Sequence, residues 1–247
     1  SGIEFKFDLG KVRYLAPGER VVVVSNRDAF SLRYSRLASA VRIAGEYRQN
    51  LSNDGETIIL SAADGSAIRN FAYNDKEPWP ELADGDGLSL VLRNPLDNPD
   101  HSDPLNWRSS TIVDGAPGSS DGSEFTGDPD LDSDDNGIND FLQYALAPDG
   151  TTPTLPSMAI QPFNLGEEGD SGDFMTFSYT RNRIADDVNY TVQQSPNLRD
   201  WSPGTAQTME LIERTENADG TDTISFRLKE EVTEAKELFL RLAVEKN

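Results

Sequence analysis

An acidic stretch in the middle of the chain has the residue types and spacing of a cation-binding loop. From Asp132 the sequence follows the pattern Asp-x-Asp-x-Asn-Gly-x-x-Asp, which ends at Asp140. Such a pattern places oxygen donors at alternate positions around a hard cation, and it places glycine where the chain must turn sharply. The sequence therefore predicts a Ca²⁺-binding loop. The apolar spacing of residues 141–146, which follow, predicts a short helix that Pro148 and Gly150 stop.

The end of this loop departs from the usual ligand pattern. If Asp132 is the first of twelve positions, the last is Gln143, where a bidentate glutamate is usual. Because a neutral amide gives one oxygen and no charge, Asp128 or Asp130 is expected to supply the missing carboxylate. The predicted metal ligands are Asp128, Asp130, Asp132, Asp134, Asn136, the backbone carbonyl of Ile138, Asp140 and Gln143. The alternative is an acidic turn that binds no ion.

Charge and composition narrow the classes of partner. The 247 residues include 22 basic and 43 acidic ones, and the net charge of -21 would repel nucleic acid and anionic lipid surfaces. The longest apolar run considered, Val21–Val24, is too short to span a bilayer, so no membrane insertion is expected. The chain has no cysteine and therefore no disulfide. Its length favours two domains.

Short strand patterns separated by Gly, Asn and Pro turns predict an all-β fold on both sides of the acidic loop. A short helix is expected within Asn26–Tyr34, capped by Asn26 or Asp28. The strands expected before the loop are Ile3–Phe7, Glu19–Ser25, Thr57–Ala62, Ser66–Tyr73 and Leu88–Leu92. Those expected after it are Met158–Ile160, Phe174–Thr180, Tyr190–Gln194, Gln207–Glu213, Thr223–Leu228 and Leu238–Val244.

The first half of the chain carries an ordered series of short motifs. They are Leu15-Ala-Pro-Gly18, Leu51-Ser-Asn-x-Gly-Glu56, Gly65, Tyr73, Trp79-Pro, Ala83-Asp-Gly-x-Gly-x-Ser-Leu90, Asn106-Trp107 and Ala116-Pro-Gly118. This series resembles the lamin tail domain of large exported bacterial proteins. The resemblance implies that residues 1–119 form an immunoglobulin-like β-sandwich that serves as an attachment or binding module without catalytic residues. Members of that family usually begin with further strands, so we expect an N-terminally truncated domain with an open sheet edge that invites strand addition.

The remainder of the chain is expected to form a connector and a second domain. Residues 120–150 are interpreted as an acidic calcium-binding connector with a short helix, and the loop is similar to those of EF-hand-like and dockerin modules, although no second copy is visible. Residues 151–247 resemble a small C-terminal β domain of exported bacterial proteins, and we expect a second small β-sandwich. That resemblance rests on Tyr190-Thr-Val-Gln-Gln-Ser195, Leu198-x-x-Trp201 and Phe239-Leu-Arg-Leu242.

The sequence gives little support to a catalytic function. Residues 118–122 match Gly-x-Ser-x-Gly by letter but lie in a loop rich in Pro and Gly, and residues 169–172 match a serine-protease motif equally superficially. Both would need a histidine, and the only one is His101, which we interpret as a solvated loop residue. Carboxylate pairs are too numerous to indicate a glycosidase, and a zinc site lacks thiols. We therefore expect no enzyme activity.

These observations favour a non-catalytic, calcium-stabilised structural or adhesion module of a larger exported bacterial surface protein. An extracellular or cell-surface location would supply enough calcium for a modest site. The expected partners are calcium and a protein or glycan ligand at the cell surface. The alternative is a carbohydrate-binding module attached to an extracellular enzyme, with Tyr14, Tyr34, Tyr47, Trp79 and Trp107 as the aromatic candidates.

Overall fold

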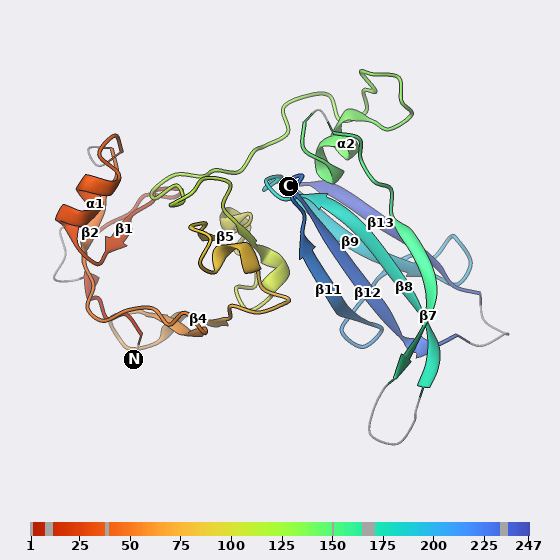
Figure 1. The fold of residues 1–247 in the computed structure, drawn as a ribbon, viewed down its shortest axis with the longest axis horizontal. Helices are drawn as coiled ribbons and strands as arrows, with labels where there is room; N and C mark the ends of the chain where they lie inside the picture. The colour runs from red at the N-terminus through yellow and green to blue at the C-terminus, as the bar shows by residue number, and fades with distance from the viewer. Residues whose placement is uncertain (1, 8–11, 38–39, 150, 165–170, 233–236) are drawn as a thin grey trace. The chain divides into compact units, whose positions relative to one another are not determined.

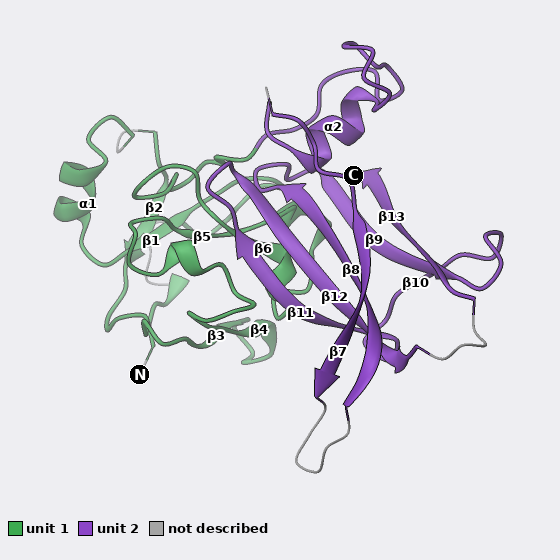
Figure 2. Cartoon of the chain, turned by 45° about the vertical axis from the view of Figure 1, so that its right-hand side comes forward, with its two compact units in different colours: residues 1–122 green, residues 123–247 purple. Residues whose placement is uncertain are grey.

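The computed structural model describes residues 2–7, 12–37, 40–149, 151–164, 171–232 and 237–247. Within these ranges the chain forms thirteen β-strands and two α-helices, which confirms the all-β class. The chain divides into two compact units, residues 1–122 and 123–247 (Figure 2). From Ser123 on, the acidic stretch expected to connect two domains lies in the second unit. No helix in the described part of the chain is long and apolar enough to cross a membrane.

The first unit contains short, two-stranded pieces of sheet among long loops (Figure 1). A parallel pair joins β1 (Val22–Val24) and β2 (Ile43–Glu46), and antiparallel pairs join β3 (Glu56–Ser61) to β4 (Ala67–Tyr73) and β5 (Leu90–Leu92) to β6 (Trp107–Ser109). Single 3-10 turns lie at Glu81–Ala83, Pro95–Asp97 and Pro104–Asn106. The regular strand predicted at Ile3–Phe7 is wrong, because only Glu4 pairs there, in an isolated bridge to Arg48.

The predicted first helix is confirmed as α1 (Arg27–Arg33). Its N-terminus follows from local chemistry, since Asn26 Oδ1 accepts a hydrogen bond from the backbone N–H of Ala29 at 2.8 Å. That bond satisfies one of the donors that every helix leaves free in its first turn.

A buried ion pair anchors the first unit, where few apolar side chains are buried. The guanidinium of Arg108 lies 2.8 Å from Asp121 Oδ1, and the two side chains are 0% and 2% exposed. The second carboxylate oxygen of Asp121 accepts from the Thr111 backbone N–H at 2.6 Å. Burial opposes ionisation of Asp121, but these contacts outweigh it and lower the pKa of the carboxyl below its ordinary value. The buried apolar side chains described in this unit are Val12, Val24, Ala44, Trp79 and Pro80.

The second unit contains two antiparallel sheets of longer strands (Figure 1). The four-stranded sheet has the order β11-β12-β8-β7, and the three-stranded sheet has the order β10-β9-β13. Their bounds are β7 Ser157–Asn164, β8 Ser171–Asn182, β9 Val188–Ser195, β10 Ser202–Pro203, β11 Met209–Glu216, β12 Thr221–Glu231 and β13 Phe239–Lys246. The stacked rings of Tyr179 on β8 and Tyr190 on β9, with centroids 5.9 Å apart, join the two sheets.

The second unit also buries a carboxylate among three arginines. Asp222, which is 0% exposed, begins β12 together with Thr221 and lies 3.3 Å from Arg181, 2.8 Å from Arg183 and 2.9 Å from Arg214. Burial alone would raise the pKa of this carboxyl, but the three guanidinium groups outweigh it and lower the pKa to about 2. The cluster therefore ties the ends of β8, β11 and β12 together through one charge.

Folding stability should depend on the ionisation of Asp222. Because its pKa is about 2 in the folded chain against an ordinary 3.8, its contribution is present above pH 4 and is lost as the pH falls toward 2. This contribution is on the order of 2 kcal/mol. In Asp222→Asn, we expect unfolding free energy to fall by about 3–5 kcal/mol at neutral pH, because three arginines lose a buried partner.

Equilibrium urea unfolding across this pH range measures both effects. The exposed residue Asp149 provides a matched control, and Asp149→Asn should leave the unfolding free energy within about 0.5 kcal/mol of the wild type. Equal stability of Asp222→Asn and Asp149→Asn would contradict the assigned role of the cluster.

Candidate functional site

The acidic segment is held to the second unit at its beginning by backbone contacts. Ser123 forms a parallel bridge with Ala185, in which its N–H donates to the carbonyl of Ile184 at 2.8 Å. Two residues later the N–H of Phe125 donates to Asp187 Oδ2 at 2.8 Å, and the Phe125 carbonyl accepts from Lys246 Nζ at 2.6 Å. Residues 123–125 are therefore held by the segment between β8 and β9 and by Lys246 at the end of β13.

The segment ends in the predicted short helix, which is confirmed as α2 (Asp140–Leu146). Asn139 caps it by accepting from the N–H of Leu142 at 2.8 Å. Phe141 and Ala145 are buried and pack with Ala185 and Val188 in an apolar cluster of the second unit.

Side chains of the β-sheets satisfy the last carbonyls of α2. Tyr190 donates to the Ala145 carbonyl at 2.6 Å, and Asn182 Nδ2 donates to the Tyr144 carbonyl at 2.9 Å. A helix leaves its last four carbonyls without internal partners, so these bonds fix the position at which α2 can end. The helix is thereby a fixed support for the loop that precedes it.

Tyr144 links the two ends of the acidic segment. Its hydroxyl lies 2.8 Å from both the Ser123 carbonyl and Asp187 Oδ1. Burial raises the pKa of the phenol well above its ordinary value, and the neighbouring Asp187 raises it further, although the hydrogen bond to Ser123 acts in the opposite direction. Nothing in the sequence pattern singles out Asp187, since its role depends on how the start of β9 lies beside residues 123–125.

The first half of the predicted calcium loop is a closed turn organised by Asp132. Its two carboxylate oxygens accept from the backbone N–H groups of Asn136 and Gly137 at 3.1 and 2.8 Å. Gly137 has a φ of +85°, which side chains rarely adopt, so glycine is required at this position. Asn136 Oδ1 accepts from the Ile138 N–H at 2.8 Å and continues the turn.

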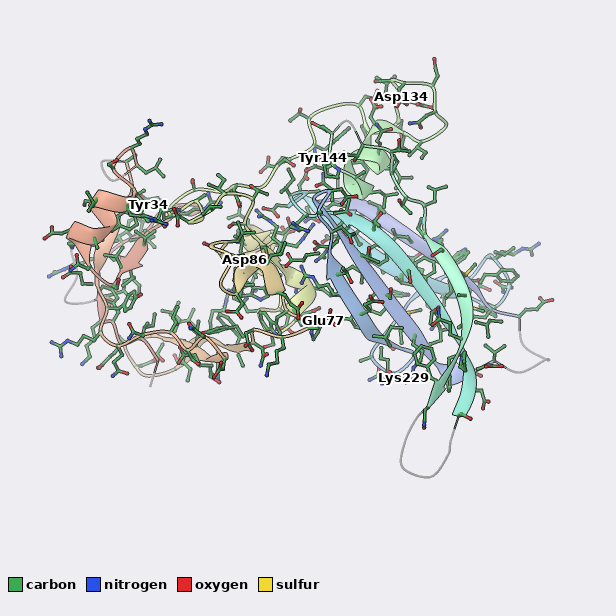
Figure 3. The ribbon with its side chains drawn as sticks, in the orientation of Figure 1. Tyr34, Glu77, Asp86, Asp134, Tyr144 and Lys229 are labelled. Carbon is green, nitrogen blue, oxygen red and sulfur yellow. The ribbon has the colours of Figure 1, made fainter. Side chains whose placement is uncertain are left out.

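Three predicted ligands meet around one amide group. Asn136 Nδ2 donates to Asp134 Oδ2 at 2.9 Å and to Gln143 Oε1 at 2.8 Å. The loop that carries Asp134 and the helix that carries Tyr144 and Gln143 are shown in Figure 3. The structure thus brings together the third, fifth and twelfth positions of the predicted loop.

The other predicted ligands have different neighbours. Both oxygens of Asp140 accept from Ser133, at 2.9 Å from its N–H and 2.6 Å from its hydroxyl, and these bonds lower the pKa of the carboxyl. Asp128 accepts from the N–H of Asp130 at 3.1 Å. Among the described residues, no three His, Cys, Asp or Glu side chains are grouped closely enough to hold a metal ion. The contacts bring Asp134, Asn136 and Gln143 together, and the partners of Asp128 and Asp140 are different residues.

The residues considered for hydrolysis make contacts within their own loops. His101 Nδ1 lies 2.8 Å from the Pro99 carbonyl, and its ring is half-buried against Phe71 with centroids 5.2 Å apart. The interpretation of His101 as a solvated residue is therefore wrong. Ser120 Oγ accepts a hydrogen bond from the N–H of Gly122, so this hydroxyl stabilises the turn in which it lies. Of the second serine motif, residues 169 and 170 lie outside the described residues.

The aromatic residues considered for a glycan surface have different environments. Trp79 is buried, with 8% exposure, and its ring packs against Trp107. Trp107 also stacks on Phe71 and donates its indole N–H to the His101 carbonyl at 2.9 Å. Tyr14 is 72% exposed, whereas the Tyr34 hydroxyl donates to the Asp114 carbonyl at 2.6 Å.

Comparisons of this chain with protein-family models, with curated proteins and with solved structures find no match. The functional argument therefore rests on the loop, on α2 and on the contacts that hold them.

Replacing Tyr144 by Phe should loosen the acidic segment. The variant removes the hydroxyl near Asp187 and Ser123, and we expect a loss of about 1–3 kcal/mol of unfolding free energy, because buried polar groups lose a partner. Urea unfolding measures the loss, with Tyr14→Phe as the exposed control. Equal stability of the two variants would show that the Tyr144 hydroxyl does not hold the segment.

Proposed function

We propose that this chain is a non-catalytic, calcium-stabilised structural and adhesion module of a larger exported bacterial surface protein. The observation that carries the proposal is the meeting of Asp134, Asn136 and Gln143, which stand at alternate loop positions and at the loop's last position. Calcium binds carboxylate and amide oxygens in such loops. The expected location is extracellular, where millimolar calcium fills even a modest site.

The side-chain amide of Asn136 supports the proposal because its oxygen and its nitrogen are nearly equal in size and can exchange places when the amide turns. Its nitrogen now bridges two oxygens, from Asp134 and Gln143. Turning the amide would present an oxygen to both neighbours, at the cost of the bond from Ile138, and three oxygens would then face one position. A cation there would replace the bridging N–H groups and would balance the charge of the carboxylate.

Calcium binding would stabilise the second unit because the loop is continuous with α2. Gln143 lies on the helix, and the neighbouring Phe141 and Ala145 pack in the apolar cluster of this unit. An ion that fixes Gln143 relative to Asp134 would therefore restrict opening of the helix from the sheets. The proposed role of the ion is structural, and no reaction step is assigned to it.

For the finer fold, we propose that residues 151–247 form a small β-sandwich and that residues 1–119 form a lamin-tail-like immunoglobulin domain. The stacked pair Tyr179 and Tyr190 supports a two-layer arrangement of the C-terminal sheets.

Calcium titrated calorimetrically into metal-stripped protein should bind at one ion per chain. Calcium at about 100 times the dissociation constant should raise the unfolding free energy by about 2.7 kcal/mol, because the ion binds only the folded chain. The double variant Asp132→Asn with Asp134→Asn should lose both effects, because it removes the charge of Asp134 and weakens the turn by which Asp132 positions Asn136.

The control variant is Glu237→Gln with Glu245→Gln, which removes the same charge from two exposed positions of the same unit. It should bind calcium as the wild type does. Absence of binding heat in the wild type, or equal loss in both double variants, would refute a specific calcium loop.

Gln143→Glu should strengthen calcium binding. The substitution restores a charged, bidentate ligand at the last loop position, and we expect an affinity gain of about tenfold or more. The same calorimetric titration measures this change, with Gln161→Glu on the exposed strand β7 as the charge-matched control. Unchanged affinity in Gln143→Glu would place the ion away from the Gln143 side chain.

A further inference from the structure

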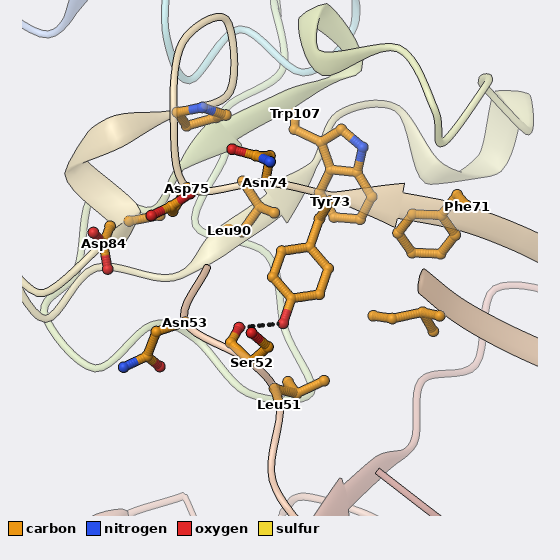
Figure 4. A pocket seen from close by; sticks show the side chains of 13 residues that line it. Leu51, Ser52, Asn53, Phe71, Tyr73, Asn74, Asp75, Asp84, Leu90 and Trp107 are labelled. Atoms are coloured by element: carbon orange, nitrogen blue, oxygen red, sulfur yellow. Dashed lines mark hydrogen bonds between the residues drawn. The ribbon is translucent and has the colours of Figure 1, made fainter. Parts of the chain in front are cut away.

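A cavity of about 330 Å³ lies in the first unit, apart from the calcium loop. The rings of Phe71, Tyr73 and Trp107 line it, together with the carboxylates of Asp75 and Asp84 (Figure 4). In that view the two carboxylates stand on one side and the three rings on the other. The lining includes acidic residues and no basic ones. The volume is at the lower end of the range for ligand pockets and suits a group the size of one side chain.

The polar ends of two of the lining rings are already used by partners within the chain. The Tyr73 hydroxyl donates to the Ser52 carbonyl at 2.6 Å, and the Trp107 indole N–H donates to the His101 carbonyl at 2.9 Å. A ligand would therefore meet aromatic surfaces from these residues, whose π-electrons attract cations.

Asp75 lines this cavity and carries one buried carboxylate oxygen without a partner. Its Oδ1 is buried and has no hydrogen-bond partner, and it is the only carboxylate oxygen among the described residues in that condition. Other buried carboxylates have cationic partners, since Asp121 contacts Arg108 and Asp222 contacts Arg181. That oxygen has almost no accessible surface, so a ligand in the cavity would meet the rest of the carboxylate, where a positively charged N–H would gain a charge-assisted contact.

We propose that this cavity binds a primary alkylammonium group, as carried by a lysine side chain or by a small free amine. The ammonium donates to the carboxylate of Asp75, while the alkyl stem and the charge contact Phe71, Tyr73 and Trp107. A neutral sugar would donate to the carboxylate but would gain nothing from the charge of the pocket. This site is separate from the calcium loop and does not depend on it.

The test uses the whole chain, labelled with ¹⁵N, and follows the indole N–H signals of its three tryptophans by NMR. n-Butylammonium should shift the Trp107 signal in a saturable manner and leave the Trp201 signal of the second unit unchanged. 1-Butanol, which has the same carbon chain without the charge, should bind at least about tenfold more weakly. Methyl glucoside should produce no saturable shift.

Variants of the pocket test the role of Asp75. Asp75→Asn should weaken n-butylammonium binding by about tenfold or more, and Asp84→Asn at the exposed rim should weaken it less. Asp97→Asn, which removes one exposed charge outside the cavity, should bind as the wild type does. If Asp75→Asn does not fold, the comparison of n-butylammonium with 1-butanol on the wild type still decides the proposal.

A comparison of two peptides distinguishes the two sources of the ammonium group. A capped pentapeptide with lysine at its centre is compared with the same peptide carrying norleucine. Binding of the lysine peptide at least as tightly as n-butylammonium assigns the site to a protein partner, and binding of the free amine alone assigns it to a small molecule. Equal binding of 1-butanol and n-butylammonium, unchanged binding in Asp75→Asn, or saturable binding of methyl glucoside alone would overturn the proposal.

Discussion

The second unit depends on one carboxylate that water does not reach. Asp222 is held by the guanidinium groups of Arg181, Arg183 and Arg214, which come from strands β8 and β11 and from the turn that follows β8. Such a cluster must be assembled almost completely, because removal of any member leaves a buried charge without a partner. The same solution recurs in the first unit, where Arg108 holds Asp121. The chain has no cysteine, and buried apolar side chains are scarce in the first unit, so these ion pairs hold strand ends and loops together within each unit.

The sequence was informative wherever the determining contacts are local. The Asn26 cap, the helix after the acidic loop and the existence of the C-terminal strands all follow from residues within a few positions of one another. The prediction of a strand at Ile3–Phe7 was wrong because a strand needs a partner strand, which the alternation of apolar and polar residues does not supply. Only Glu4 pairs there, in a bridge to Arg48. The pairing order of the sheets depends on contacts between distant segments, which periodicity does not encode.

The candidate site shows the same division between local and distant information. Spacing predicted the turn around Asp132 and the glycine at position 137, because both are set by backbone geometry within the loop. It did not predict that Asp140 would bond Ser133, nor that Asp187 would hold Phe125 and Tyr144. From sequence, an aspartate just before a strand is interpreted as a solvated turn residue. Only the folded structure shows that Asp187 holds residues of another segment.

The two proposed sites require different cations for a reason that lies in their linings. A hard divalent ion gives up water only to several oxygen ligands, as the group Asp134, Asn136 and Gln143 would begin to supply. The cavity at Asp75 offers aromatic surface in place of most of those oxygens, so calcium would lose more hydration there than it regains. An alkylammonium loses less, because its charge is single and its stem is apolar. In a chain with a net charge of -21, attraction to cations is general, and selectivity must therefore come from the atoms that replace water.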